Sequence, residues 1–379
     1  MSDFRGTGDF DHGGTPAVGV LLSNLGTPDA PTTAALRRYL REFLSDPRVI
    51  ELPRFKWWLI LNLFILTTRP RKSAELYRKV WSAKDGSPLL AIARRQQAGI
   101  ETALRQRFGG ALHVALGMRY GEPAIRGALR ELADRGCRRI LVLPLYPQYF
   151  SGTVGSTFDA VADEIKTWRW VPELRFVQHY HDQPGYIAAL AASVRETWRE
   201  YQPEKLLMSF HGIPQRYFDA GDPYFCECQK TARLLAEALG LERSRWELSF
   251  QSLFGKEEWV KPYTDRTVRA LARSGVKSLD VLAPGFSADC LETLEELDGL
   301  NREFFTHAGG ERFRFIRCLN ERPDHVAFLA DLVASQLAGW VEPKATYDDN
   351  ATAAAADARR TRAEAMRARP RAADGSYLS

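Results

Sequence analysis

The stretch that decides the fold is Ser287–Phe304, which reads S-A-D-C-L-E-T-L-E-E-L-D-G-L-N-R-E-F. It follows an apolar run, Leu279–Ala283, and a Pro-Gly turn. This order predicts a buried strand, a turn and then a helix whose N-cap would be Ser287 or Asp289. Strand–turn–helix units of this kind are typical of a parallel sheet covered by helices.

Three acidic residues would share one face of this predicted helix. Asp289, Glu292 and Glu296 are three and four residues apart, and residues with that spacing are neighbours on a helix. Like charges so close together are costly unless a cation lies beside them. The row is therefore either a solvated helix face or one wall of a cation site, and the helix alone does not decide between the two.

Length and composition predict a globular protein of two domains. With 45% apolar and 26% charged residues, the composition is that of a globular protein. The chain has 379 residues and is therefore too long for one ordinary core. The formal net charge is +5, and six Arg against one Glu between Arg359 and Arg371 account for all of it. The remainder is near neutral, so no nucleic-acid partner is indicated.

The two halves of the chain repeat one pattern of strands and helices. The segments 23–28, 112–121 and 129–136 have counterparts in the same order at 209–214, 246–255 and 268–275. We therefore predict an α/β protein with two similar Rossmann-like domains, each a parallel β-sheet flanked by helices. Ligands of such sheets bind at the carboxyl ends of the strands, so we expect a cleft between the domains.

The expected limits of these domains follow from changes in composition. We predict a disordered N-terminus at 1–16, a first domain at 17–145 plus 322–342, a second domain at 146–321, and a disordered Ala- and Arg-rich tail at 343–379, with at most a frayed helix in it. We expect no signal peptide. The strongest apolar run, Trp57–Leu66, is shorter than the about 20 residues that span a bilayer.

Other motifs exclude several classes of site. The dinucleotide and P-loop fingerprints are absent, although Gly152 and Gly155 follow a strand and could cradle an anion. The five cysteines match no disulfide framework, which favours a reducing cytosol and structural roles. His179 and His181 are two residues apart and could bind a metal ion, but the sequence offers no third ligand near them.

His211 stands out because it closes a predicted strand within S-F-H-G-I-P. The matching residue of the first half is Leu25, so the shared fold does not require a histidine there. It is either a structural residue or a proton acceptor and metal ligand that faces the cleft. Aromatic residues gather at the same strand ends, including Tyr120, Tyr146, Tyr149, Trp259 and Phe286, and they would suit a wide, flat, apolar ligand.

As an ordered set, these motifs resemble those of the ferrochelatase family. The matching motifs are L-S-N-L-G-T-P at 22–28, R-Y at 119–120, L-Y-P-Q-Y at 145–149, S-F-H-G-I-P at 209–214, G-D-P-Y at 221–224, Trp259, and A-P-G-F-S-A-D-C-L-E-T-L-E-E at 283–296. The resemblance covers Val18 to Trp340 and implies a chelatase-type fold. It also implies insertion of Fe²⁺ into protoporphyrin IX to form protohaem, with release of two protons.

The resemblance further implies a role for each matching residue. His211 and Glu292 would be the catalytic and metal-binding pair, and Asp289 and Glu296 would extend the acidic row. The porphyrin would contact Asn24, Leu25, Arg69, Lys72, Ser87, Arg119, Tyr120, Trp259 and Phe286. Trp57–Leu66 would form an apolar lip that rests on a membrane surface.

The chain departs from the family pattern at several positions, and these departures predict which cofactor and substrate to expect. The loop after Y-P-Q-Y reads F-S-G and the tail holds no cysteine, so we expect no [2Fe–2S] cluster and no permanently bound cofactor. Leu25 favours protoporphyrin over coproporphyrin, and Leu300 ends the acidic row early. We expect a cytoplasmic enzyme, peripheral on the inner membrane, with a porphyrin-donating enzyme as its protein partner. The alternatives are a tetrapyrrole-binding carrier and a related chelatase for another metal or porphyrin.

Overall fold

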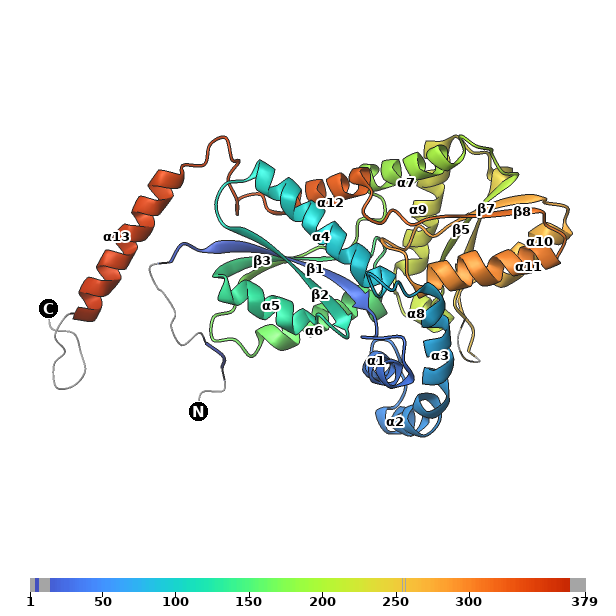
Figure 1. Ribbon diagram of the computed structural model, residues 1–379, viewed down its shortest axis with the longest axis horizontal. Coiled ribbons are helices and arrows are strands. Elements are labelled where there is room, and N and C mark those ends of the chain that lie inside the picture. The colour runs from blue at the N-terminus through green and yellow to red at the C-terminus, as the bar shows by residue number, and fades with distance from the viewer. Residues whose placement is uncertain (1–3, 7–13, 254, 256, 369–379) are drawn as a thin grey trace.

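The computed structural model describes residues 4–6, 14–253, 255 and 257–368. Within these residues the chain forms two four-stranded parallel sheets, ordered β2-β1-β3-β4 and β6-β5-β7-β8 (Figure 1). The strands are β1 (Ala17–Gly26), β2 (Leu112–Tyr120), β3 (Cys137–Pro144), β4 (Glu173–Phe176), β5 (Lys205–His211), β6 (Trp246–Gln251), β7 (Ser278–Leu282) and β8 (Arg312–Ile316).

The second sheet repeats the topology of the first. β1 pairs in parallel with β2 and β3, and β5 pairs in the same way with β6 and β7. The matching segments 23–28 and 209–214 fall at the ends of β1 and β5. The predicted internal repeat and the α/β fold of two similar domains are therefore confirmed.

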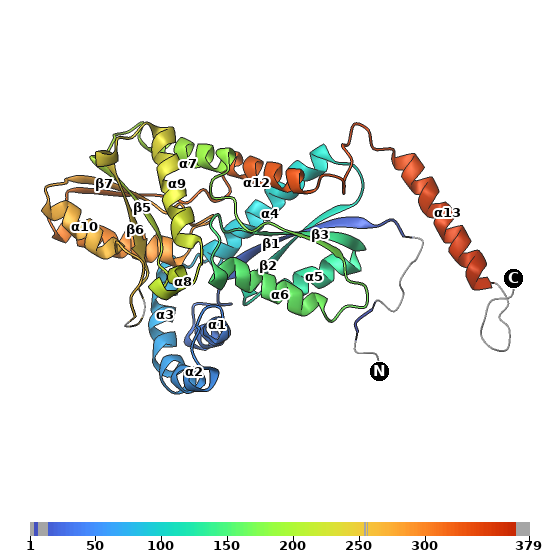
Figure 2. The same cartoon turned by 180° about the vertical axis from the view of Figure 1, so that it is seen from behind.

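Helices cover both faces of the sheets (Figures 1 and 2). The α-helices are α1 (Thr33–Ser45), α2 (Arg54–Ile60), α3 (Leu66–Val80), α4 (Pro88–Arg107), α5 (Ile125–Asp134), α6 (Ser156–Ile165), α7 (Pro184–Thr197), α8 (Gln215–Asp219), α9 (Tyr224–Leu239), α10 (Thr264–Arg273), α11 (Arg302–His307), α12 (Pro323–Gln336) and α13 (Asp349–Ala368). Three π-helices, η1 (Leu61–Ile65), η2 (Ser151–Gly155) and η4 (Glu292–Asn301), and one 3₁₀-helix, η3 (Arg243–Arg245), complete the described part of the chain.

The burial of β1 shows how the sequence sets these layers. Val20 and Leu22 pack into the same core cluster as Ile100 of α4, whereas Leu21 packs into another cluster with Leu129 of α5. Successive side chains of a strand point to opposite faces, so a continuous apolar run needs helices on both sides. Burying each of these side chains stabilises the fold by about 1.5–3 kcal/mol.

The two sheets share one core. The cluster that contains Val20 of β1 also contains Phe210 of β5 and Tyr186 of α7. Helix α12 packs against both α4 and α7, and so joins the two halves. The strand ends that carry the predicted site residues are therefore held by continuous packing between the domains.

The structure corrects three predicted boundaries. The first domain extends beyond residue 145, because β4 pairs with β3. Part of the predicted disordered N-terminus is ordered, since Arg5 forms backbone hydrogen bonds of 2.7 and 2.8 Å with Thr167 and Arg169. In the tail, α13 is a regular helix that projects from the body (Figure 1). Residues 1–3, 7–13 and 369–379 lie outside the described residues.

The predicted apolar lip is helical and protrudes from the body. α2, η1 and α3 follow one another without a break from Arg54 to Val80 and project beside α1 (Figures 1 and 2). The buried side chains of Trp57 and Leu61 pack with α1. Among the described residues, no helix combines the length and the apolar character needed to cross a membrane.

Candidate active site

His211 is the last residue of β5, at the carboxyl end of the second sheet. Its Nδ1 lies 2.6 Å from the carbonyl oxygen of Gly212. A carbonyl oxygen only accepts hydrogen bonds, so Nδ1 carries the proton and Nε2 presents a lone pair. Gly212 is needed because a Cβ atom there would lie 2.9 Å from the Gln251 carbonyl oxygen and 3.0 Å from the Trp259 ring. The sharp exit from the strand therefore depends on this glycine.

Glu292 and Glu296 lie on η4, which is a π-helix and not the α-helix that the sequence predicts. π-helices have i to i+5 hydrogen bonds, are rare, and occur frequently at functional sites. No side chain caps the N-terminus of η4, so the predicted caps Ser287 and Asp289 are wrong. η4 begins at Glu292, later than the predicted caps place it, in the segment that follows β7.

The carboxylate of Glu296 is hydrogen-bonded to Ser252, the residue that follows β6. The carboxylate accepts hydrogen bonds from the backbone N–H of Ser252, at 2.7 Å, and from the Ser252 hydroxyl. Ser252 has a φ of 68°, which is uncommon for a residue other than glycine. Burial raises the pKa of Glu296 above its ordinary value, and the charge of Glu292 adds to the rise, whereas Ser252 and His211 oppose it. These two carboxylates and the imidazole therefore influence one another within one site.

Asp289 does not belong to this acidic pair. Its side chain is fully buried, and its carboxylate lies 2.7 Å from Arg317 Nε and 2.6 Å from Asn320 Nδ2. The backbone N–H of Cys318 also donates to it, at 3.3 Å. The predicted row of three acids is therefore wrong at Asp289, because this residue precedes the helix and binds the segment that follows β8.

Buried tyrosines surround Glu292. Tyr39 of α1, Tyr77 of α3 and Tyr146 of the loop after β3 each have a pKa raised well above the ordinary value, by burial first and by the charge of Glu292 in addition. The hydroxyl of Tyr146 is buried without a hydrogen-bond partner among the described residues. Buried polar atoms are almost always hydrogen-bonded, so Tyr146 leaves a position for a ligand.

Sequence reasoning singled out Tyr146 but missed Tyr39 and Tyr77. Both occupy buried positions on amphipathic helices, where a tyrosine is ordinarily part of the core. The only signal available was their place beside the apolar lip. Nothing in the sequence shows that α3 contacts η4, or that Leu291, the residue before η4, packs in one cluster with Tyr39 of α1.

The predicted basic contacts lie on α3. Burial lowers the pKa of Arg69, and the charge of Glu292 opposes this lowering. Lys72 is three residues further along and exposed. Ser87 is buried directly before α4. Arg69 and Lys72 thus lie on a helix that contacts η4, and Lys72 is exposed.

Four other predicted contacts lie at the strand ends. Asn24 and Leu25 close β1, and Leu25 packs in the same cluster as Leu291, the residue before Glu292. Phe286 packs against the start of α4. The rings of His211 and Trp259 have centroids 6.4 Å apart, and the Trp259 indole N–H is buried without a partner among the described residues.

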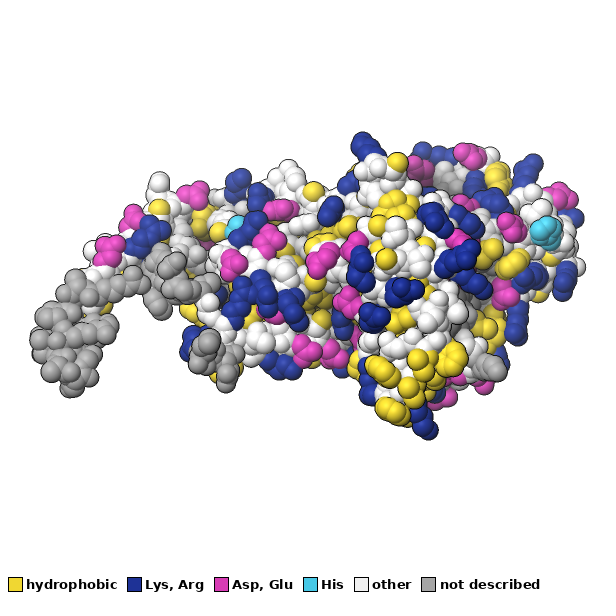
Figure 3. Space-filling view, turned by 60° about the horizontal axis from the view of Figure 1, so that its bottom comes forward, with side chains coloured by type: hydrophobic (Ala, Val, Ile, Leu, Met, Phe, Trp, Pro, Cys, Tyr) yellow, Lys and Arg dark blue, Asp and Glu magenta, His cyan; other side chains and the backbone are white. Residues whose placement is uncertain are grey.

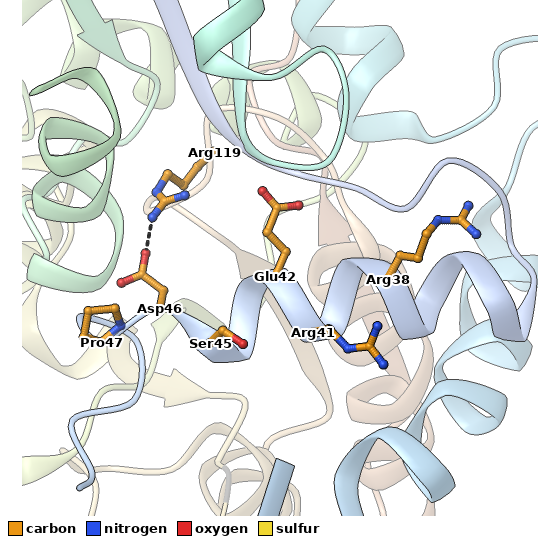
Figure 4. A pocket seen from close by; sticks show the side chains of 7 residues that line it. All are labelled: Arg38, Arg41, Glu42, Ser45, Asp46, Pro47 and Arg119. Carbon is orange, nitrogen blue, oxygen red and sulfur yellow. Dashed lines mark hydrogen bonds and ion pairs between the residues drawn. The ribbon is translucent and has the colours of Figure 1, made fainter. Parts of the chain in front are cut away.

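Arg119 and Tyr120, the two remaining predicted porphyrin contacts, both bind Asp46. Tyr120 is 0% exposed, and its hydroxyl donates to Asp46 at 2.8 Å. The guanidinium of Arg119 pairs with the same carboxylate and donates to the Ser156 carbonyl oxygen at 3.0 Å. Figure 4 shows Arg119 pointing toward Asp46, beside a hollow of about 530 Å³ on the exposed face of α1. Asp46 thus draws both side chains into a structural polar cluster.

Comparison with solved structures places the fold among the chelatases. The structure of SirB from Bacillus subtilis with Fe³⁺ matches 84% of this chain and 95% of its own, with a TM-score of 0.50 and 10% sequence identity. At this identity the likeness shows the fold alone. Together, the fold and a site of one imidazole and two carboxylates define a chelatase-type protein.

Sequence comparison identifies the family. The family model described as Ferrochelatase matches residues 17–337. The ferrochelatase of Thioalkalivibrio sulfidiphilus is 57% identical over 367 residues, covering 97% of this chain and 99% of the relative. That of Hydrogenovibrio crunogenus is 59% identical over 337 residues, covering 88% and 89%. The chain therefore belongs to the ferrochelatase family. Members are enzymes that insert iron into protoporphyrin in haem synthesis, and this chain is an enzyme of that class.

Proposed function

We propose that the chain inserts Fe²⁺ into protoporphyrin IX, forming protohaem, and that the reaction takes place between His211 and η4. The observation that carries this proposal is geometric: His211 ends β5 opposite Gln251, and the next residue, Ser252, donates a hydrogen bond to Glu296 of η4, which also carries Glu292. His211 presents Nε2 with its lone pair. The unpartnered hydroxyl of Tyr146 and the indole N–H of Trp259 offer polar contacts for a ligand in the same region.

The reaction makes two chemical demands that these residues meet. Two pyrrole N–H protons must leave, and the iron must exchange water ligands for ring nitrogens. The neutral imidazole of His211 can accept a proton or bind the metal. Glu292 and Glu296 supply hard oxygen ligands, and the raised pKa of Glu296 allows it to hold a proton closer to neutral pH. Proton acceptance and metal delivery can therefore be divided between β5 and η4.

Porphyrin binding requires apolar walls and cations for the two carboxylates of the ring. Leu25, Phe286 and Trp259 supply apolar surface from three separate segments. We assign the porphyrin carboxylates to Arg69 and Lys72, since guanidinium and ammonium groups bind carboxylates strongly. A rigid wall that holds the ring bent lowers the barrier, because the bent ring is nearer the transition state.

The test is an anaerobic assay with protoporphyrin IX and Fe²⁺. Protoporphyrin fluorescence should decay catalytically, with many turnovers per protein, as haem absorption rises. A control without iron should show only the change caused by binding. A signal that stops at one porphyrin per protein, with no haem, would instead identify a carrier, and turnover with another metal alone would identify a different chelatase.

We further propose that the protein is cytoplasmic and binds a membrane surface through the lip. Its exposed apolar side chains include Phe55, Trp58, Leu63 and Phe64, which are 74, 57, 57 and 66% exposed. Figure 3 shows hydrophobic side chains gathered at this projecting end, with Lys and Arg beside them. Exposed apolar patches rimmed by basic residues are typical of surfaces that enter the headgroup region of a bilayer.

We also propose that the protein carries no iron–sulfur cluster. Four of its cysteines are buried and only Cys226 is exposed. In the described part of the chain, no cysteine belongs to a group of three or more candidate metal ligands. The purified protein should therefore lack the visible absorption of a [2Fe–2S] centre, and such absorption would overturn the proposal.

A further inference from the structure

A second group of metal-ligand side chains lies outside the site described above. His179 and His181 follow β4 in the segment that leads from the first sheet to α7, and Glu227 lies on α9. The ligand atoms of the three residues are all within 4.8 Å of one another. His179 Nδ1 is 2.6 Å from Glu227 Oε1, and His181 Nδ1 is 3.3 Å from Glu227 Oε2.

The imidazole of His181 indicates that this group is more than an ion pair. Its side chain is only 6% exposed, and its Nδ1 has no hydrogen-bond partner among the described residues. This nitrogen lies 3.3 Å from Glu227 Oε2 and makes no hydrogen bond to it. A cation between Nδ1 and the carboxylate would satisfy both groups.

We propose that His179, His181 and Glu227 bind one divalent transition-metal ion, for which Zn²⁺ is the best match. Two imidazoles and a carboxylate are common zinc ligands, and tetrahedral donors about 2.0–2.1 Å from zinc lie roughly 3.3 Å apart. The contact between His181 and Glu227 already has that length. The 2.6 Å contact of His179 lengthens as its Nδ1 proton moves to Nε2 and the ion takes the place of the hydrogen bond.

Other polar groups lie around the three proposed ligands. Asp182 Oδ2 lies 3.9 Å from His181 Nε2, which is too far for a hydrogen bond but places a negative charge on the side of the ring away from the ion. Lys230 pairs with Asp182 at 2.6 Å and reduces the negative charge around the site. The backbone N–H of Tyr149 donates to Glu227 Oε2 at 2.7 Å. His179 is 49% exposed, which leaves an entry path and room for water as the fourth ligand.

The ion has a structural consequence because the ligands come from separate segments. It ties the connection between the sheets to α9 and, through Glu227, to the loop that holds Tyr146 and Tyr149. Neither His211 nor η4 supplies a ligand. The site is therefore distinct from the one that handles the iron substrate, and it stabilises the junction between the domains.

The test uses full-length, metal-free protein that carries His211→Ala, because this substitution weakens metal binding at the active site. The probe is Co²⁺ alone, without porphyrin. We expect one tight equivalent of Co²⁺ with the visible absorption of four-coordinate cobalt. Replacing a residue that only hydrogen-bonds to a metal ligand already lowers the metal affinity by about 10–100-fold. His179→Gln, which removes a ligand, should therefore weaken binding at least about 100-fold. The matched control is His307→Gln, because His307 is exposed on α11.

Thermal unfolding supplies an independent measurement. Zn²⁺ should raise the unfolding temperature of the His211→Ala protein and of its His307→Gln variant, but not of its His179→Gln variant. His179 is half exposed, so its replacement should not prevent folding. The proposal is overturned if the His211→Ala protein binds no Co²⁺ tightly, or if His179→Gln changes neither the cobalt affinity nor the thermal response to zinc.

Discussion

The backbone N–H of Ser252 lies 2.7 Å from Glu296 Oε1, and this hydrogen bond ties the π-helix to the end of β6. β6 pairs with β5 so that Gln251, the residue before Ser252, lies opposite His211. The carboxylate is therefore held in a constant position relative to the imidazole by strand pairing and not by a flexible loop.

His211→Ala should abolish iron insertion and leave porphyrin binding intact. The variant loses the one imidazole at the site, and general acid–base groups contribute about 10²–10⁴-fold to rate. We expect kcat to fall by at least that factor in the anaerobic assay, with an unchanged Kd for protoporphyrin by fluorescence titration. His307→Ala is the control. Undiminished turnover in the His211 variant would remove this residue from the mechanism.

Glu292→Gln should also lose most activity while the fold stays intact. The amide keeps the size of the side chain but neither binds a cation strongly nor accepts a proton. Turnover should fall by about 10²-fold or more, with an unchanged unfolding temperature. The matched control is Glu303→Gln, an exposed glutamate on the following helix, α11. Near-normal turnover of the Glu292 variant would contradict its assignment.

Asp289→Ala should act on stability. The buried carboxylate binds the exposed Arg317, the half-buried Asn320 amide and the buried Cys318 N–H, and its removal leaves the last two donors without this partner. Each such group costs about 1–3 kcal/mol, so we expect the free energy of unfolding to fall by about that amount in urea titrations. The exposed control Asp134→Ala should stay within about 0.5 kcal/mol. An unchanged stability with lost activity would return Asp289 to the acidic row.

Replacing two lip aromatics by acids should release the protein from membranes. Phe55 and Phe64 are 74 and 66% exposed, and burying them in a bilayer is favourable only while they are apolar. The double variant Phe55→Glu and Phe64→Glu should no longer sediment with vesicles that contain anionic lipid. Phe158→Glu, at a 52% exposed position on α6, is the control. Equal sedimentation of both proteins would exclude the lip as the membrane contact.

His325 should make the protein sensitive to acid. The ring is fully buried, its Nδ1 lies 2.8 Å from the Asn320 carbonyl oxygen, and burial lowers its pKa from 6.5 to about 4. The unfolded chain then binds more protons than the folded one between these two pKa values. The contribution is complete above pH 6.5 and is lost as the pH falls toward 4.

The size of this effect follows from the shift. A difference of about 2.5 pKa units corresponds to about 3 kcal/mol of unfolding free energy. Urea titrations of the wild type from pH 7 to pH 4 should lose about 3 kcal/mol more than those of His325→Gln, whose side chain does not titrate. Parallel pH profiles of the two proteins would show that His325 is not the responsible group.

Much of the fold could be predicted because its signals are local. Apolar runs that end in turns marked the strands, and the repeated order of segments 23–28 and 209–214 marked the two similar sheets. The domain limits were harder to predict. β4 carries only four residues, of which none is fully buried, so its pairing with β3 has no strong apolar pattern.

The residues of the candidate site could likewise be predicted only in part. Sequence spacing placed Glu292 and Glu296 together, because residues four apart on a helix are neighbours whatever surrounds the helix. The same rule failed for Asp289, since η4 begins three residues later and the buried carboxylate binds the segment that follows β8. The hydrogen bond from the Tyr120 hydroxyl to Asp46 joins residues 74 apart in the chain, so no local pattern predicts it.

The sequence by itself determined the strand–turn–helix units, their repetition, and the positions of His211 and Glu292 at the ends of such units, because these depend on neighbours along the chain. Only the tertiary structure decided which side chains meet. The opening stretch became a π-helix whose Glu296 binds Ser252, and His179 and His181 acquired Glu227 as a partner 46 residues beyond His181. Such contacts depend on how separate elements pack, and no local pattern encodes them.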